Sequence, residues 1–138
     1  MTLGMLTALR TTRATAIRDL LDIGATGALI DIYDGTRPAT GAAVTTQILL
    51  ATLTCSTISG TITNGVLTFN AITDGTGTAG ATVGGKNATW CRFRDSSSTF
   101  VMDGSVGLSG ADINLNSVLI ATGQTVSVTS GSITEGNA

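Results

Sequence analysis

Residues 6–35, LTALRTTRATAIRDLLDIGATGALIDIYDG, contain the change of pattern that decides the fold. In the first part, apolar residues recur with the period of a helix, about 100° per residue. The residues in this apolar arc are Leu6, Leu9, Ala16, Ile17, Leu20 and Leu21. From Ala28 onward, residues alternate with the period of two that is typical of a strand. The stretch therefore predicts one helix followed directly by β-structure.

The helix is predicted over residues 12–23. Thr11 or Thr12 can cap its first turn, and Gly24 suits the position just after its last turn. Residues 1–11 would then form an N-terminal arm. Arg13 projects onto the apolar arc and Arg10 lies at its edge. Two interpretations are open for Arg13: its aliphatic stem snorkels to solvent, or the side chain is buried against a partner subunit.

Every later segment has the strand period. Alternating runs occupy residues 28–35, 47–55, 65–73, 87–95, 98–106, 111–117 and 125–134. An Asn-Gly turn at Asn64-Gly65 precedes the third run, residues 36–46 read as a loop, and residues 74–86 read as a low-complexity loop. This order predicts a mainly-β protein, namely a jelly-roll-like β-sandwich of seven or eight short strands with one N-terminal helix. Residues 12–138 would form this single domain.

The composition fits a β-protein with many turns. The 138 residues include 26 Thr, 11 Ser and 18 Gly, and only 12% are charged, against about 25% in an average globular protein. A net charge of −2 argues against nucleic-acid binding, which needs a basic face. No apolar run reaches the length of about 18 residues that predicts a transmembrane helix. The N-terminus has no basic region before its apolar residues, so we expect synthesis in the cytoplasm and no membrane partner.

Catalytic chemistry has little support in the sequence. The absence of histidine removes the usual serine-hydrolase triad and most transition-metal sites. The segment GTGTAG at 75–80 matches a dinucleotide-binding pattern, but a strand follows it where a helix should. Cys55 and Cys91 are expected to be buried thiols, although their pairing stays open. The sequence therefore predicts a protein without enzymatic activity, cofactor or metal.

The segment WCRFRDSSSTFVMDGSVG, residues 90–107, gathers the only Trp, two of the three Phe and two of the seven basic residues. On a strand, Cys91 and Phe93 would face the core, whereas Trp90, Arg92 and Arg94 would share the opposite face. Trp and Arg are enriched among interface anchors. These three residues, with Arg10 and Arg13, are the predicted interface residues. The alternative is that Trp90 covers the edge of the sandwich and that the arginines are solvated.

Several segments resemble a widespread family of small virion proteins encoded by tailed bacteriophages. They are LRTTRATAIRDLLD, IDIYDGTRPATG, LLATLT, ATWCRFRD and DGSVGLSGADINLNS with the end GQTVSVTSGSITEGN. The resemblance covers nearly the whole chain, and its most distinctive parts are IYDGTRPA and DGSVGLSGADINLN. It implies a non-enzymatic capsid cement (decoration) protein on the virion surface. Its implied partners are the major capsid protein and further copies of itself, as a trimer or dimer.

Two other functions are consistent with the residues. The chain could belong to the tail or the head–tail junction of the virion. It could also be a host-recognition module whose Thr, Ser and Asn side chains bind glycans, although glycan-binding faces usually expose several aromatic side chains. The number of copies per particle separates these functions best.

Overall fold

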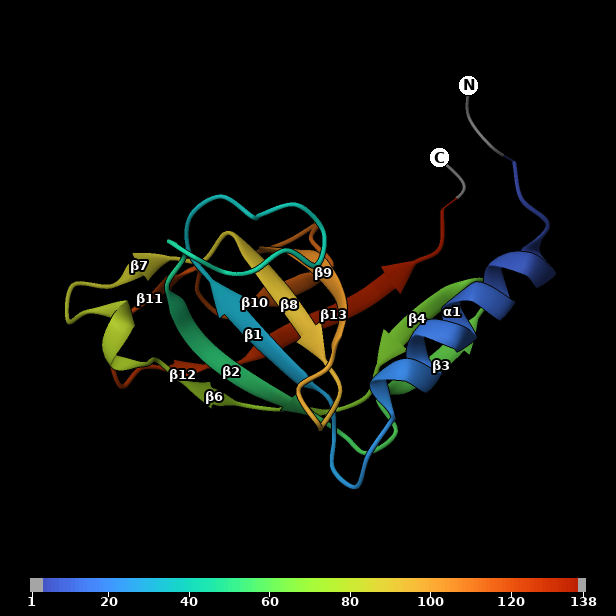
Figure 1. Cartoon of the computed structure of the whole chain (residues 1–138), viewed down its shortest axis with the longest axis horizontal. Coiled ribbons are helices and arrows are strands. Elements are labelled where there is room, and N and C mark those ends of the chain that lie inside the picture. Colours follow the sequence, from blue (N-terminus) through green and yellow to red (C-terminus); the bar gives the residue numbers. More distant parts are fainter. Residues whose placement is uncertain (1–3, 137–138) are drawn as a thin grey trace.

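The computed structural model describes residues 4–136, and its chain order is one α-helix followed by β-strands and one short 3₁₀-helix (Figure 1). This confirms the prediction of a mainly-β fold with one N-terminal helix. The elements are α1 (Thr7–Leu21), β1 (Leu29–Tyr33), β2 (Leu49–Cys55), β3 (Gly60–Thr63), β4 (Val66–Phe69), β5 (Ile72–Thr73), β6 (Gly75–Thr76), η1 (Ala79–Ala81), β7 (Lys86–Asn87), β8 (Trp90–Arg94), β9 (Phe100–Gly107), β10 (Ile113–Leu115), β11 (Leu119–Ile120), β12 (Thr125–Val126) and β13 (Val128–Thr134).

The helix begins earlier than predicted. It starts at Thr7, after Leu6 in an extended conformation, and no side chain caps its first turn. Residues 7–11, assigned to a free arm from the sequence, are therefore helical, and residues 1–3 of that arm lie outside the described residues. Thr11 and Thr12 satisfied the sequence criterion for a cap, but Thr12 instead donates a hydrogen bond to the carbonyl of Ala8 within the helix.

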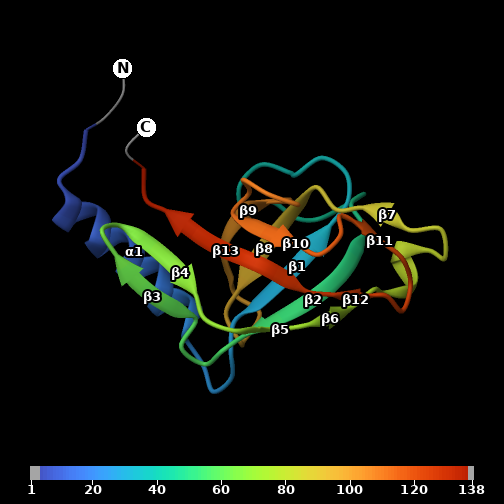
Figure 2. The same ribbon diagram turned by 180° about the vertical axis from the view of Figure 1, so that it is seen from behind.

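Nine strands form one curled, mixed sheet in the order β3-β4-β13-β10-β9-β8-β1-β2-β5. Two small sheets, β7 with β11 and β6 with β12, extend it at one end (Figure 2). The pairs are antiparallel except β9 with β10. This single curled sheet is not clearly the two-sheet jelly-roll sandwich that strand spacing suggested, because spacing along the chain does not specify which strands pair.

The predicted Asn-Gly turn is present. Asn64 and Gly65 both have positive φ, 52° and 82°, and they join β3 to β4 in register, with Thr63 opposite Val66. This is the geometry that a two-residue hairpin requires. The hairpin packs against α1, and together these three elements form a lobe at one end of the long axis of the molecule (Figure 1).

One apolar core connects the lobe to the rest of the sheet. It includes Leu21 of α1, Leu67 of β4, Phe93 of β8 and Ile113 of β10, all 0% exposed. Phe93 stacks on Phe69, with ring centroids 5.6 Å apart. Strands β1 and β2 also contribute to this core, with Ile30 and Ile32 from β1 and Ala51, Leu53 and Cys55 from β2 among its members.

The segment 74–86 is ordered, contrary to the prediction of a low-complexity loop. It contains β6, η1 and the start of β7. Its glycines allow close approach of the backbone: a Cβ on Gly77 would lie 1.9 Å from the carbonyl oxygen of Ala121, and one on Gly75 would lie 2.5 Å from that of Thr52. The glycines therefore pack against neighbouring strands, and they cannot form the phosphate-binding loop that GTGTAG superficially matches.

The distinctive stretch DGSVGLSGADINLN forms a tight arch between the parallel strands β9 and β10. The carboxylate of Asp112 accepts hydrogen bonds from the backbone N–H and the hydroxyl of Ser105, at 2.8 and 2.9 Å. The side chain of Asn114 bonds to the backbone of Ala111 and to the hydroxyl of Ser130. These polar residues therefore shape the fold, since parallel neighbours ordinarily need a much longer connection.

Candidate interaction surfaces

The face of β8 opposite the core carries a row of polar residues across four strands, and three of the four are charged. Thr52, Asp31, Arg92 and Asp103 are successive neighbours in the registers of β2, β1, β8 and β9. The row alternates carboxylate, guanidinium and carboxylate. Opposite charges on directly facing strand positions attract, whereas like charges would destabilise the sheet.

All three guanidinium nitrogens of Arg92 donate hydrogen bonds within the domain. Its Nε and Nη2 atoms donate to the two carboxylate oxygens of Asp103 at 2.7 and 3.0 Å, and its Nη1 donates to the carbonyl of Ala42 at 2.9 Å. The exposed fractions of the Arg92 and Asp103 side chains are 10% and 1%. The pKa of Arg92 lies above its ordinary value, chiefly because of the hydrogen bond to Asp103. This is a buried, bidentate ion pair.

Arg94 forms a second ion pair on the same face. Its Nε lies 2.6 Å from a carboxylate oxygen of Asp31, without the alignment of a hydrogen bond. The hydroxyl of Thr52 donates to the other oxygen of Asp31 at 2.7 Å. The Arg94 side chain is 24% exposed, so it is the most accessible of the three predicted residues on β8.

Trp90 is buried on the same face. Its ring stacks on Tyr33 with centroids 4.7 Å apart, and its indole N–H donates to the carbonyl of Asp34 at 3.1 Å. The guanidinium of Arg92 lies 5.4 Å from the Trp90 ring and 5.0 Å from the Phe100 ring. Only 3% of Trp90 is exposed. The indole is therefore a packing element of the domain.

The segment after β1 covers this face. Carbonyls of Asp34 and Ala42 accept the hydrogen bonds from Trp90 and Arg92, and Figure 1 shows this loop arching over β1 and β8. The predicted sidedness is correct, because Cys91 and Phe93 are 0% exposed in the core. The predicted exposure of Trp90 and Arg92 is wrong. Both faces of β8 are covered, because residues 36–46, expected to be a loop, fold over the face opposite the core.

Arg10 and Arg13 hold the end of β13. Arg10 Nε donates to the backbone carbonyl of Glu135 at 2.9 Å, and the Arg13 guanidinium pairs with the Glu135 carboxylate at 2.9 Å. The backbone N–H of Glu135 in turn donates to the carbonyl of Gly65 in the β3–β4 turn. We call Arg10, Arg13, Gly65 and Glu135 the C-terminal clamp. Arg13 is still 51% exposed, so neither sequence interpretation describes it fully.

Exposed apolar side chains gather on α1 and on the residues that flank it. The exposed fractions are 75% for Leu6, 49% for Leu9, 50% for Leu20 and 49% for Ile23. Only Ala14 and Leu21 of the helix are buried, facing the sheet. The wide apolar arc seen in the sequence is thus only partly covered by β3 and β4. Strands β7 and β11 lie at the opposite end of the molecule (Figure 1). Val83, just before β7, is 92% exposed, and Leu119 of β11 is 49% exposed.

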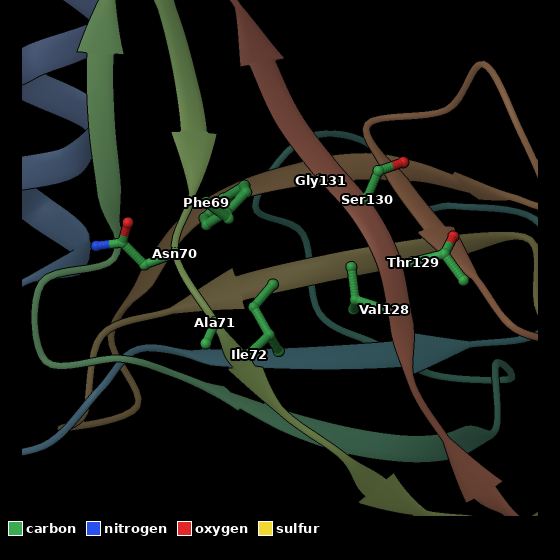
Figure 3. A pocket seen from close by; sticks show the side chains of 8 residues that line it. All are labelled: Phe69, Asn70, Ala71, Ile72, Val128, Thr129, Ser130 and Gly131. Atoms are coloured by element: carbon green, nitrogen blue, oxygen red, sulfur yellow. The ribbon is translucent and has the colours of Figure 1, made fainter.

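A shallow pocket of about 190 Å³ opens where the chain leaves β4 and crosses β13 (Figure 3). Its lining consists of Phe69, Asn70, Ala71, Ile72, Val128, Thr129, Ser130 and Gly131. Small-molecule sites usually span about 300–1,000 Å³. The pocket is therefore smaller than a typical ligand site, and it marks the seam between the lobe and the rest of the sheet.

Potential metal ligands and nucleophiles are dispersed. Residues 4–136 contain no cluster of three or more Cys, Asp or Glu side chains that could hold a metal ion. Cys55 and Cys91 are free, buried thiols. Burial raises the pKa of Cys55 to about 12 and also raises the pKa of Cys91. Asp95 accepts hydrogen bonds from the backbone of Ser97 and Thr99, as expected for a turn aspartate.

Comparison of the chain with known protein families, with curated proteins and with solved structures gives no match. No helix within residues 4–136 is long and apolar enough to cross a membrane.

Proposed function

We propose that this chain is a non-enzymatic structural protein of a tailed bacteriophage virion, and that it acts as a capsid cement protein on the major capsid protein shell. The proposal joins the resemblance of its segments to small virion proteins with one structural observation. Exposed apolar side chains lie at both ends of the long axis, on α1 and around Val83. A subunit repeated across a lattice needs at least two separate contact surfaces, because each copy must touch more than one neighbour.

The low charge of the chain agrees with this role. The few charges at the centre of the domain pair internally, as Arg92 does with Asp103 and Arg94 with Asp31. Each end also exposes apolar side chains, and apolar area is what drives most protein association. A glycan-binding module is less well supported, since Tyr33 and Trp90 stack on each other and Trp90 is buried.

The copy number per particle tests the proposal. We expect gel densitometry of purified particles of the encoding phage to give hundreds of copies. A count of tens or fewer would instead indicate a tail or head–tail junction protein. Absence of the chain from purified particles would overturn a virion role altogether.

A depletion experiment tests the cement activity itself. A protein that binds only the assembled shell shifts the equilibrium toward that shell. Particles that lack this chain should therefore assemble but release DNA at lower temperature or under milder osmotic stress. Equal robustness of depleted and complete particles would contradict the cement function.

The end around Val83 can be tested separately. Val83→Asp changes a side chain that is 92% exposed, so folding should be unaffected while binding to shells weakens. Leu108→Asp is the matched control, because Leu108 is 61% exposed in the β9–β10 arch, away from either end. Equal loss of shell binding in both variants would show a general charge effect and would remove Val83 as a contact.

A further inference from the structure

We propose that α1 is a self-association surface that binds α1 of a second copy of this chain in antiparallel orientation. The surface is the α1 stripe, defined as Leu6, Leu9, Arg13, Ala16, Leu20 and Ile23. All six residues are at least partly exposed, and the stripe lies beside the helix face that packs on β3 and β4. This inference concerns the isolated protein in solution and does not depend on a virion role.

The spacing of the α1 stripe matches a two-helix interface. Its residues are separated alternately by three and four positions. The residues that form the contact between two paired helices in a coiled coil follow the same heptad spacing. Over these positions the helix and its flanking residues extend about 26 Å. Ala14, Ile17 and Leu21 form the helix face that packs on the sheet of its own chain. The α1 stripe is therefore a second apolar face, which packing within the domain does not require.

The stripe is complementary to itself when reversed, as a two-fold symmetric contact requires. In antiparallel register, Leu6 faces Ile23 of the second copy and Leu9 faces its Leu20. Arg13 then faces Ala16, whose small side chain leaves room for the longer one. Large residues thus meet at both ends of the interface, and the one charged residue meets the smallest. This reverse symmetry is what selects a second copy as the occupant.

The charges near the two-fold axis also balance. The two Arg13 side chains would lie in adjacent layers at the centre of the contact. Each is already paired with Glu135 of its own chain at 2.9 Å. Two guanidinium groups and two carboxylates would therefore surround the axis, so the like charges are compensated by opposite ones.

The expected complex is weak and depends on concentration. Contacts that bury less than about 1,200 Å² in total are typical of transient association, and a single pair of helices lies in this range. Sedimentation equilibrium of the purified full chain should show dimers between about 10 μM and 1 mM.

Substitutions in the α1 stripe test this interface. Leu9→Glu and Leu20→Glu should each make the protein monomeric over the same concentration range. Leu108→Glu places the same charge on an exposed leucine elsewhere, so this variant should dimerise like the wild type. Unchanged far-UV circular dichroism of the variants will show that they fold. A monomeric wild type, or dimers in both stripe variants, would overturn the proposal.

Cysteine cross-linking tests the orientation. A mixture of Leu9→Cys and Leu20→Cys chains should form a disulfide-linked dimer under mild oxidation, and either variant alone should not. In antiparallel register, the two copies of residue 9 are about 16 Å apart along the axis, whereas a disulfide needs Cα atoms within about 7 Å. Native Cys55 and Cys91 are buried and should not interfere. Efficient cross-linking of Leu9→Cys alone would contradict the antiparallel arrangement.

Discussion

Arg92→Met should be the most informative single substitution in the domain. Methionine keeps much of the aliphatic length of arginine but removes the guanidinium, so the Asp103 carboxylate, 1% exposed, loses its partner. Breaking a buried ion pair on one side typically costs about 3–5 kcal/mol, because an uncompensated charge remains in the interior. The lost hydrogen bond to the Ala42 carbonyl also loosens the covering segment.

The expected loss of stability in Arg92→Met can be expressed as a decrease in melting temperature. For 138 residues, the entropy of unfolding is about 0.29 kcal/mol per kelvin, so a loss of 3–5 kcal/mol lowers Tm by about 10–17 °C. Urea unfolding should show the same loss as a lower midpoint with an unchanged slope. The control is Arg18→Met, which breaks the exposed pair with Asp19 and should cost about 0.5 kcal/mol or less.

A second variant separates burial of the charge from loss of packing. In Arg92→Met with Asp103→Leu, no charge is left without a partner, so this double variant should be more stable than Arg92→Met by about 1–3 kcal/mol. The reasoning is refuted if Arg92→Met costs less than about 1 kcal/mol, or if the double variant is no more stable than the single one.

Three further predictions concern the core, the thiols and the C-terminal clamp. Phe93→Ala should cost about 3–5 kcal/mol in urea unfolding, because the ring is fully buried against Phe69; a loss below about 1 kcal/mol would show that the site collapses around the smaller side chain. Cys55 and Cys91 should resist a thiol reagent at pH 8 until the chain unfolds, since burial raises both pKa values. As pH rises above about 9, unfolded thiols ionise while the folded thiols stay protonated, so the free energy of unfolding should fall by up to about 1.4 kcal/mol per pH unit for each thiol; a flat profile between pH 9 and 11 would contradict this. Arg10→Ala should accelerate hydrogen exchange of the Glu135 amide with little change at the core strands, and unchanged exchange would show that Arg10 does not fasten this end.

Local patterns predicted the elements of this protein well. The alternating runs at residues 28–35 and 47–55 identified β1 and β2, and Asn64-Gly65 identified a hairpin turn. The side chains of β8 that face the core were also predictable, because Cys91 and Phe93 alternate with Trp90 and Arg92 along the strand. Each of these inferences uses residues close together in the sequence, where geometry fixes the period.

Long-range pairing was not predictable in the same way. No local pattern indicates that β13 inserts between β4 and β10, or that residues 36–46 cover Trp90 and Arg92. The sequence did contain one usable signal, since Asp31, Arg92 and Asp103 all lie on strands at positions opposite the core. Their charges require partners when buried, and pairing them would have indicated an internal network instead of an exposed interface.

The position of β13 has a consequence for how the domain is made. β13 follows all the other described strands in the sequence, and it lies between β4 and β10. Glu135, directly after β13, accepts a hydrogen bond from Arg10, 125 residues away in sequence. Before β13 is synthesised, no strand joins β4 of the α1 lobe to β10 of the rest of the sheet. Two open strand edges then face solvent, and such edges can pair with other chains. Termination of the chain shortly before residue 128 should therefore yield an aggregation-prone fragment, and the addition of β13 closes the gap in the sheet.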